Sequence, residues 1–123
     1  MNTLFVYGTL RRGEINSFHL DSSRFLGMDR LPGFVIADLG EYPMAFETGN
    51  PEDSIAIEIY EVNDSVLRSI DILEDCEEGN PGSMYNRKLV TGRSGTTGFV
   101  YYGEESGSYS RFPLIAGGDW KER

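Results

Sequence analysis

The hydrophobic period of this chain changes once, close to residue 63, and that change limits the fold class more than any other feature. Residues 55–60 alternate isoleucine with other side chains, the period of two that is typical of a strand with one buried face. Between residues 66 and 73, valine, leucine and isoleucine recur at helical spacing, and Asn63 or Asp64 can serve as the N-cap. The chain therefore combines strands with at least one helix.

Shorter apolar runs predict further strands over residues 4–7, 34–37, 85–91 and 97–102, each bounded by glycine- or proline-containing turns. Residues 11–21 are polar and compatible with a short helix. Five or more short strands with few helices favour an α+β fold. We expect a small mixed, mostly antiparallel sheet, curled into a barrel, with one to three flanking helices.

The length of 123 residues fits one domain, covering residues 1–123. No apolar run is long enough to span a bilayer, and the first residues lack the pattern of a signal peptide. We therefore expect a cytoplasmic protein without a membrane partner. The net charge of −9 repels phosphate backbones and argues against nucleic acid as a partner, although it is explained well enough by solubility.

Two counts restrict the chemistry. Cys76 is the only cysteine and His19 the only histidine, so there is no internal disulfide and no multi-cysteine zinc site. A Ser-His-Asp or Cys-His site would have to use His19, which we interpret as a helix surface residue, and Cys76 as structural or incidental. We expect no metal and no cofactor, and a reaction carried by carboxylates, hydroxyls and backbone groups.

The loop after the first strand is one candidate site. Gly8 lets the backbone approach a ligand closely, and successive N–H groups there can form an anion-binding nest. Thr9 adds a hydroxyl and Arg11 a cation, so the loop suits a substrate carboxylate. The spacing matches neither a phosphate loop nor a dinucleotide fingerprint, and an ordinary strand-to-loop turn explains it as well.

Glu74 is the second candidate. On a helical wheel it falls inside the apolar stripe formed by Leu67, Ile70 and Leu73, where lost hydration raises the pKa of a carboxylic acid. Such a group suits a general base that later acts as an acid. The alternative is that residues 74–78 form a solvated acidic helix end, although acids at a helix C-terminus oppose the macrodipole. The several tyrosines near the strands are expected mainly to pack.

Motifs along nearly the whole chain, in the same order, resemble the gamma-glutamylcyclotransferase-like family, which includes the gamma-glutamylamine and butirosin-biosynthesis cyclotransferases. The motifs are Phe5-Val6-Tyr7-Gly8-Thr9-Leu10-Arg11, Leu39-Gly40-Glu41-Tyr42-Pro43, Ile59-Tyr60-Glu61-Val62, Ile70-Asp71-Ile72-Leu73-Glu74, Met84-Tyr85-Asn86-Arg87, Phe99-Val100-Tyr101 and Gly118-Asp119-Trp120. The chain departs from the family in having Asp75 where glycine is frequent, and a longer acidic loop over residues 75–83.

The resemblance implies a reaction and a site. The enzyme would convert a small-molecule gamma-glutamyl amide to 5-oxoproline and a free amine, without a cofactor. Glu74 would be catalytic. Substrate binding would fall to Tyr7, Gly8, Thr9 and Leu10 in the loop, and to Tyr85 and Tyr101 near the cavity. A non-catalytic ligand-binding module of the same fold is the alternative, and an acidic mimic of nucleic acid a third. The amine portion and the oligomeric state stay open.

Overall fold

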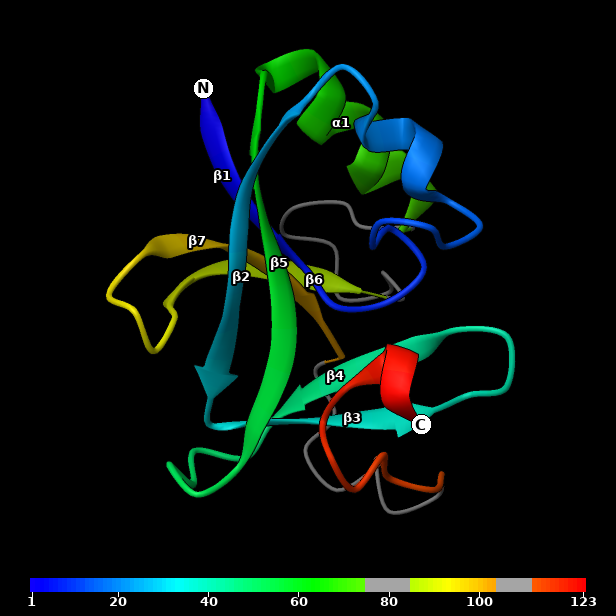
Figure 1. Ribbon diagram of the computed structural model, residues 1–123, viewed down its shortest axis with the longest axis vertical. Helices are drawn as coiled ribbons and strands as arrows, with labels where there is room; N and C mark the ends of the chain where they lie inside the picture. The colour runs from blue at the N-terminus through cyan, green and yellow to red at the C-terminus, as the bar shows by residue number, and fades with distance from the viewer. Residues whose placement is uncertain (75–84, 104–111) are drawn as a thin grey trace.

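The computed structural model describes residues 1–74, 85–103 and 112–123, and Cys76 and the acidic loop over residues 75–83 lie outside them. Within these residues the elements follow one another as β1 (Asn2–Val6), η1 (Ser17–Leu20), β2 (Arg24–Pro32), β3 (Phe34–Asp38), β4 (Pro43–Glu47), β5 (Ser54–Val62), α1 (Asp64–Leu73), β6 (Asn86–Thr91), β7 (Thr97–Tyr102) and η3 (Trp120–Glu122). Figure 1 shows α1 and η1 together at one end, and η3 beside the β3–β4 hairpin. The α+β class predicted from the sequence is confirmed.

The strands form two sheets. The larger has the order β2-β5-β1-β7-β6, and the smaller pairs β3 with β4. β1 runs antiparallel to β5 but parallel to β7, so the sheet is mixed and mostly antiparallel, as expected. The large sheet curls without closing into a barrel. The turn between β6 and β7 still reaches the far edge, where Arg93 N–H donates to the carbonyl oxygen of Arg30 at 2.8 Å.

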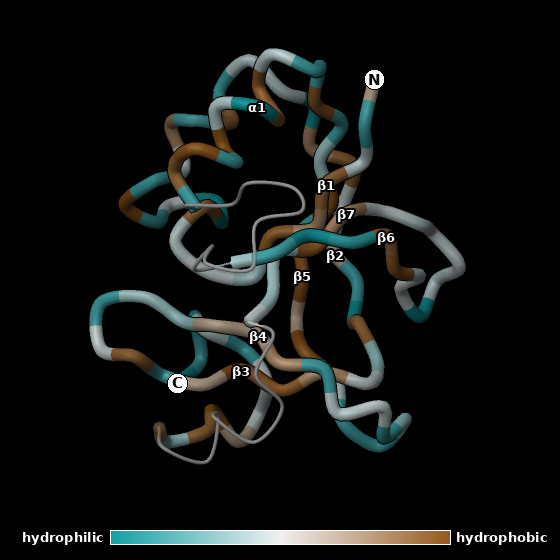
Figure 2. Tube along the Cα trace, turned by 180° about the vertical axis from the view of Figure 1, so that it is seen from behind, coloured by the Kyte–Doolittle hydropathy of each residue, from teal (hydrophilic) through white to brown (hydrophobic). Residues whose placement is uncertain are grey.

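β5 corrects one prediction. The strand was expected to bury one face, but Ala56, Glu58 and Tyr60 are buried as well as the isoleucines. β5 is an interior strand between β2 and β1, and the chain after β1 packs over its second face, where Glu58 meets Arg11. The hydropathy along the trace shows the same feature, with an apolar run through β5 in the middle of the molecule (Figure 2).

Two strands escaped prediction. β2 is an edge strand in which Leu26 and Met28 are solvent-exposed, and a register shift between Phe25 and Gly27 interrupts its pairing with β5. β4 begins at Pro43, a residue that argues against a strand unless it stands at the first position or an edge. The short helix expected over residues 11–21 is a single 3₁₀ turn, η1.

α1 begins and ends as the sequence indicates. The Asn63 side chain accepts a 2.8 Å hydrogen bond from Val66 N–H and so caps the helix. Leu67 and Ile70 are buried in the core on one face of the large sheet, together with Leu4. A second core, containing the neighbouring Phe5, lies on the other face. No helix within the described ranges is long and apolar enough to cross a membrane.

Candidate active site

A cleft of about 670 Å³ opens where β1 ends. Five parts of the chain line it: the end of β1 with the loop after it, the turn between β3 and β4, the end of α1, the residue before β6 together with β7, and the C-terminal segment. The lining residues are Phe5, Val6, Tyr7, Gly8, Thr9, Leu10, Ile15, Asn16, Gly40, Glu41, Tyr42, Pro43, Leu73, Glu74, Tyr85, Tyr101 and Arg123. All seven residues that the sequence indicated for catalysis and substrate binding lie on this one cleft.

The loop after β1 presents backbone to the cleft. A Cβ atom on Gly8 would lie 2.5 Å from Cγ of Pro43, so only glycine allows the loop to pass this close to the β3–β4 turn. Asn16 holds the loop by donating from its amide to the Oγ1 of Thr9 at 3.0 Å and from its backbone N–H to the Thr9 carbonyl at 2.9 Å. Within the described residues, no acceptor takes a hydrogen bond from the backbone N–H groups of Gly8, Thr9 or Leu10. These donors are available to an anionic group.

Glu74 is the C-cap of α1, and its backbone N–H donates to the carbonyl oxygen of Ile70 at 2.9 Å. Burial raises the pKa of Glu74 from an ordinary 4.5 to about 7. Its carboxyl group takes part in no hydrogen bond or ion pair with the described residues, so lost hydration alone causes the shift. A carboxyl group poised between its two protonation states near neutral pH suits both acceptance and return of a proton.

Three tyrosines of the cleft each donate their hydroxyl proton to another part of the protein. The hydroxyl of Tyr7 donates to the carbonyl oxygen of Tyr101 at 2.8 Å, and that of Tyr85 to the carbonyl of Pro43 at 2.7 Å. The Tyr101 hydroxyl donates to Asp71 at 2.6 Å. Burial, with the nearby Glu74 as a smaller cause, raises the pKa of Tyr7, and burial likewise raises that of Tyr85, so both stay neutral. Each hydroxyl proton is already donated to a carbonyl or carboxylate oxygen. These tyrosine oxygens can therefore accept a hydrogen bond from a ligand but cannot donate one.

Arg11 does not serve as the cation of this site, contrary to the expectation from the loop sequence. Its Nε donates to Glu58 at 2.9 Å and its Nη1 to Asp119 at 2.6 Å, and the side chain is buried away from the cleft. Burial opposes the charge of the guanidinium, but its hydrogen bonds with the two carboxylates outweigh burial and raise the pKa of Arg11. Arg11 therefore ties the loop to β5 and to the C-terminal segment.

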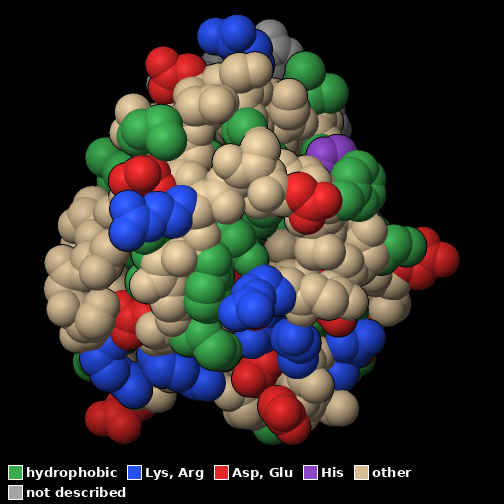
Figure 3. Space-filling model, turned by 45° about the horizontal axis from the view of Figure 1, so that its top comes forward, with side chains coloured by type: hydrophobic (Ala, Val, Ile, Leu, Met, Phe, Trp, Pro, Cys, Tyr) green, Lys and Arg blue, Asp and Glu red, His purple; other side chains and the backbone are tan. Residues whose placement is uncertain are grey.

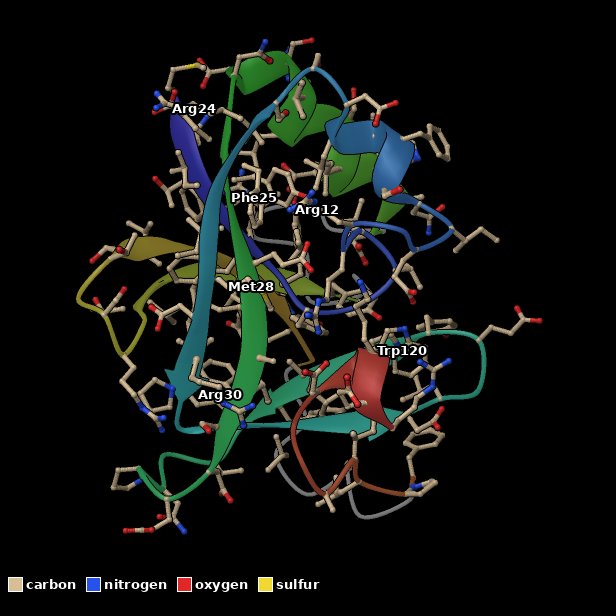
Figure 4. All side chains as sticks on the ribbon, viewed as in Figure 1. Arg12, Arg24, Phe25, Met28, Arg30 and Trp120 are labelled. Atoms are coloured by element: carbon tan, nitrogen blue, oxygen red, sulfur yellow. The ribbon has the colours of Figure 1, made fainter. Side chains whose placement is uncertain are left out.

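The sequence missed two charged groups on the cleft, Glu41 and Arg123. Glu41 follows Gly40 in the β3–β4 turn, and Arg123 stacks over the ring of Trp120, with 3.5 Å between the guanidinium carbon and the ring centroid. Figure 4 labels Trp120 on η3, beside the β3–β4 hairpin. The space-filling view shows arginines and lysines gathered in the lower half of one face, interspersed with acids (Figure 3). Glu41 and Arg123 come together on the cleft only because distant parts of the chain fold onto each other, and no local sequence pattern indicates either residue.

No group of three or more histidine, cysteine, aspartate and glutamate side chains within the described ranges could hold a metal ion. His19 lies on η1 with its ring 4.2 Å from that of Phe18, and it does not line the cleft. Donors and acceptors that could face a ligand lie on different parts of the described cleft. Free backbone donors lie on the loop after β1, and acceptors lie on Glu74 and the tyrosines.

The chain is similar to known proteins over almost its whole length. The family described as "Gamma-glutamyl cyclotransferase, AIG2-like" matches residues 4–122. A Vibrio cholerae protein named "Putative gamma-glutamylcyclotransferase" is 36% identical over 121 residues, covering 98% of this chain and 96% of that protein.

Two solved structures are also similar. The mouse AIG2-like protein has a TM-score of 0.74 and 29% identity, with 94% of this chain and 86% of that chain covered. The solution structure of Escherichia coli YtfP has a TM-score of 0.70 and 27% identity, with 98% of this chain and 99% of that chain covered.

Proposed function

The chain belongs to the gamma-glutamyl cyclotransferase, AIG2-like family, and from this we propose that it converts a gamma-glutamyl amide to 5-oxoproline and a free amine, with Glu74 as general acid and base. The observation that carries the proposal is the state of Glu74. It is a carboxyl group on the wall of a cleft, without a partner among the described residues, and its pKa is raised to about 7.

In the proposed reaction the nucleophile belongs to the substrate. The α-amine of the gamma-glutamyl group attacks its own γ-carbonyl carbon, which forms a nitrogen–carbon bond and closes a five-membered ring. Glu74 takes the proton that this nitrogen must lose. It then gives the proton to the departing nitrogen as the original amide bond breaks. Atoms and charge balance without water, metal or a protein nucleophile.

The loop after β1 and the carboxyl group of Glu74 support one orientation of substrate. The N–H groups of Gly8, Thr9 and Leu10, which donate to no described residue, suit the α-carboxylate or the oxyanion that develops on the γ-carbonyl oxygen. The α-amine then faces Glu74 and the tyrosine oxygens, which only accept. Holding both ends folds the flexible glutamyl chain so that the amine meets the carbonyl, which lowers the entropic part of the barrier.

We expect a small-molecule substrate in the cytoplasm, and neither nucleic acid nor a membrane as a partner. The cleft of about 670 Å³ has a suitable size for a small molecule. The net charge of −9 is unfavourable for binding phosphate backbones or anionic lipid surfaces.

The test is release of 5-oxoproline from a panel of gamma-glutamyl amino acids, gamma-glutamyl-ε-lysine, gamma-glutamyl polyamines and glutathione. Glu74→Gln keeps the shape of the side chain but cannot exchange the proton, so we expect it to lower kcat about 10²–10⁴-fold. Glu52→Gln, at an exposed position in the turn before β5, is the matched control. If the wild-type protein releases no 5-oxoproline but still binds panel members, the non-catalytic binding module replaces this proposal.

A further inference from the structure

Asp71 lies one helical turn before Glu74 and is held from two strands at once. Arg87 of β6 donates to its two carboxylate oxygens, from Nε at 2.8 Å and from Nη2 at 3.2 Å. The Tyr101 hydroxyl of β7 donates to the same carboxylate at 2.6 Å. Resting on the function proposed above, we infer that Asp71, Arg87 and Tyr101 form a positioning cluster that holds Glu74 over the substrate.

The last residues of α1 depend on this cluster because the buried apolar contacts of the helix end at Ile70. Leu67 and Ile70 are buried, but Ile72 is 77% exposed and Leu73 39% exposed. At the other end of the helix, Asn2 donates to Asp64 at 2.8 Å. Among the described side chains, Asp71 is therefore the polar anchor that joins the final turn of the helix to the sheet.

The geometry of the cluster is rigid. The bidentate contact fixes the plane of the Arg87 guanidinium against the Asp71 carboxylate, and the same guanidinium lies 4.6 Å from the centroid of the Phe99 ring. The two charged side chains are only 19% and 18% exposed, so water competes less with their pairing than at an open surface. Residues three apart on a helix lie on the same face, so any shift of Asp71 also moves Glu74.

Glu74 has no side-chain hydrogen bond or ion pair of its own within the described residues. Its position over the cleft is consequently set by the helix backbone that carries it. Asp71 itself is occupied by a guanidinium and a hydroxyl, so it is not available to exchange a proton with substrate. Its role is therefore to position Glu74 rather than to act on the substrate.

The experiment compares Asp71→Asn with Glu47→Gln. Glu47 pairs with Lys88, the residue after Arg87 in β6, so the control also removes a carboxylate that pairs with β6, at a site away from the cleft. Displacement of a catalytic group by about 1 Å can lower rates about 10²-fold. We expect Asp71→Asn to lower kcat about 10- to 100-fold with KM within about twofold, and Glu47→Gln to change neither. Arg87→Lys, which keeps one charged contact, should fall between them.

A second arm separates positioning from loss of fold. In the Glu74→Gln background, Asp71→Asn should have no further effect on kcat, because there is no base left to place. An equal loss in both backgrounds would overturn the proposal, as would a wild-type kcat in Asp71→Asn.

A third arm does not use activity. Hydrogen exchange at the amides of Leu73 and Glu74 should become at least about tenfold faster in Asp71→Asn and stay unchanged in Glu47→Gln. Unchanged exchange in Asp71→Asn would overturn the positioning role even if the wild-type protein releases no 5-oxoproline. Failure of the reaction and failure of the cluster are thus told apart.

Discussion

The hydroxyl of Tyr7 donates a 2.8 Å hydrogen bond to the carbonyl oxygen of Tyr101, a residue 94 positions away in the chain. The same oxygen atom accepts a 3.1 Å hydrogen bond from the backbone N–H of Ala45. One buried phenol therefore joins the end of β1 to β7 and to β4, directly beneath the cleft. Tyr7 therefore holds together three strands that surround the cleft.

Tyr7→Phe tests this structural role. The substitution removes one donor and one acceptor, and leaves the buried Ala45 N–H without a partner. We expect the free energy of unfolding to fall by about 1–3 kcal/mol, measured by urea denaturation. Tyr42→Phe is the control, because Tyr42 lines the same cleft and its hydroxyl has no hydrogen bond to described residues, and it should cost less than about 0.5 kcal/mol. Equal effects of the two changes would contradict the role of Tyr7.

The pH dependence of the reaction should report Glu74. Its carboxyl group acts as a base only when ionised, and burial raises its pKa to about 7. We therefore expect kcat/KM to rise about tenfold per pH unit below pH 7 and to level off above it. A steady-state profile from pH 5 to 9 measures this limb, which should be absent from the residual activity of Glu74→Gln. The same limb in both proteins would assign the titration to another group.

The sequence predicted the parts of the site that depend on local pattern. The helical pattern indicates Glu74 because a carboxylic acid rarely occupies a position inside an apolar helical stripe. Gly8 was found because a glycine directly after an apolar strand allows close backbone approach. Both inferences need only the near neighbours in the chain, and the structure brings both residues to one cleft.

The rest of the site depends on contacts that no local pattern encodes. Arg11 looked like an open cation because its partners, Glu58 and Asp119, lie 47 and 108 residues away. The partners of Asp71 likewise come from two later strands. β2 was missed because an edge strand does not need an apolar face, so its sequence lacks the alternation that marks β5. The roles of Arg11 and Asp71 and the place of β2 therefore depend on pairing between distant parts of the chain.

The buried pairing of Arg11 leads to a prediction about stability. Arg11→Met leaves Glu58, which is 3% exposed, as a buried carboxylate without its cation. We expect the free energy of unfolding to fall by about 3–5 kcal/mol, measured by urea denaturation. Lys88→Met, in the exposed pair with Glu47, should cost less than about 1 kcal/mol. A large rise in KM for Arg11→Met without loss of stability would instead place the guanidinium on the substrate.

Gly8→Ala should separate loop position from stability. The new Cβ atom would lie 2.5 Å from Cγ of Pro43, so the loop must move away from the β3–β4 turn. Such overpacking costs about 1–3 kcal/mol, and it displaces the N–H groups that we expect to bind the substrate. KM for the best panel substrate should therefore rise, whereas Gly117→Ala, where the Cβ meets no atom within 4 Å, should leave it unchanged. An unchanged KM in Gly8→Ala would remove these N–H groups from substrate binding.

The raised pKa of Glu74 also predicts how stability depends on pH. The unfolded chain ionises this carboxyl group near its ordinary value of 4.5, whereas the folded protein keeps the proton up to about pH 7. Between these values the folded state binds more protons than the unfolded state, so the contribution of Glu74 to the free energy of unfolding falls as pH rises. Below about 4.5 both states are protonated and the cost is absent. Above about 7 both are ionised, and the cost reaches its limit of about 3 kcal/mol.

Glu74→Gln cannot ionise and so escapes this cost. We expect the variant to gain about 2–3 kcal/mol relative to wild type between pH 5 and pH 8, in urea denaturation of both proteins at both pH values. Taking the difference between the two proteins at each pH removes the contributions of all other titrating groups. Glu52→Gln, at an exposed position outside the cleft lining, controls for the acid-to-amide change itself. A constant gap between wild type and Glu74→Gln at both pH values would mean that the carboxyl group is hydrated in the folded protein, and the basis for its role as a proton carrier near neutral pH would be lost.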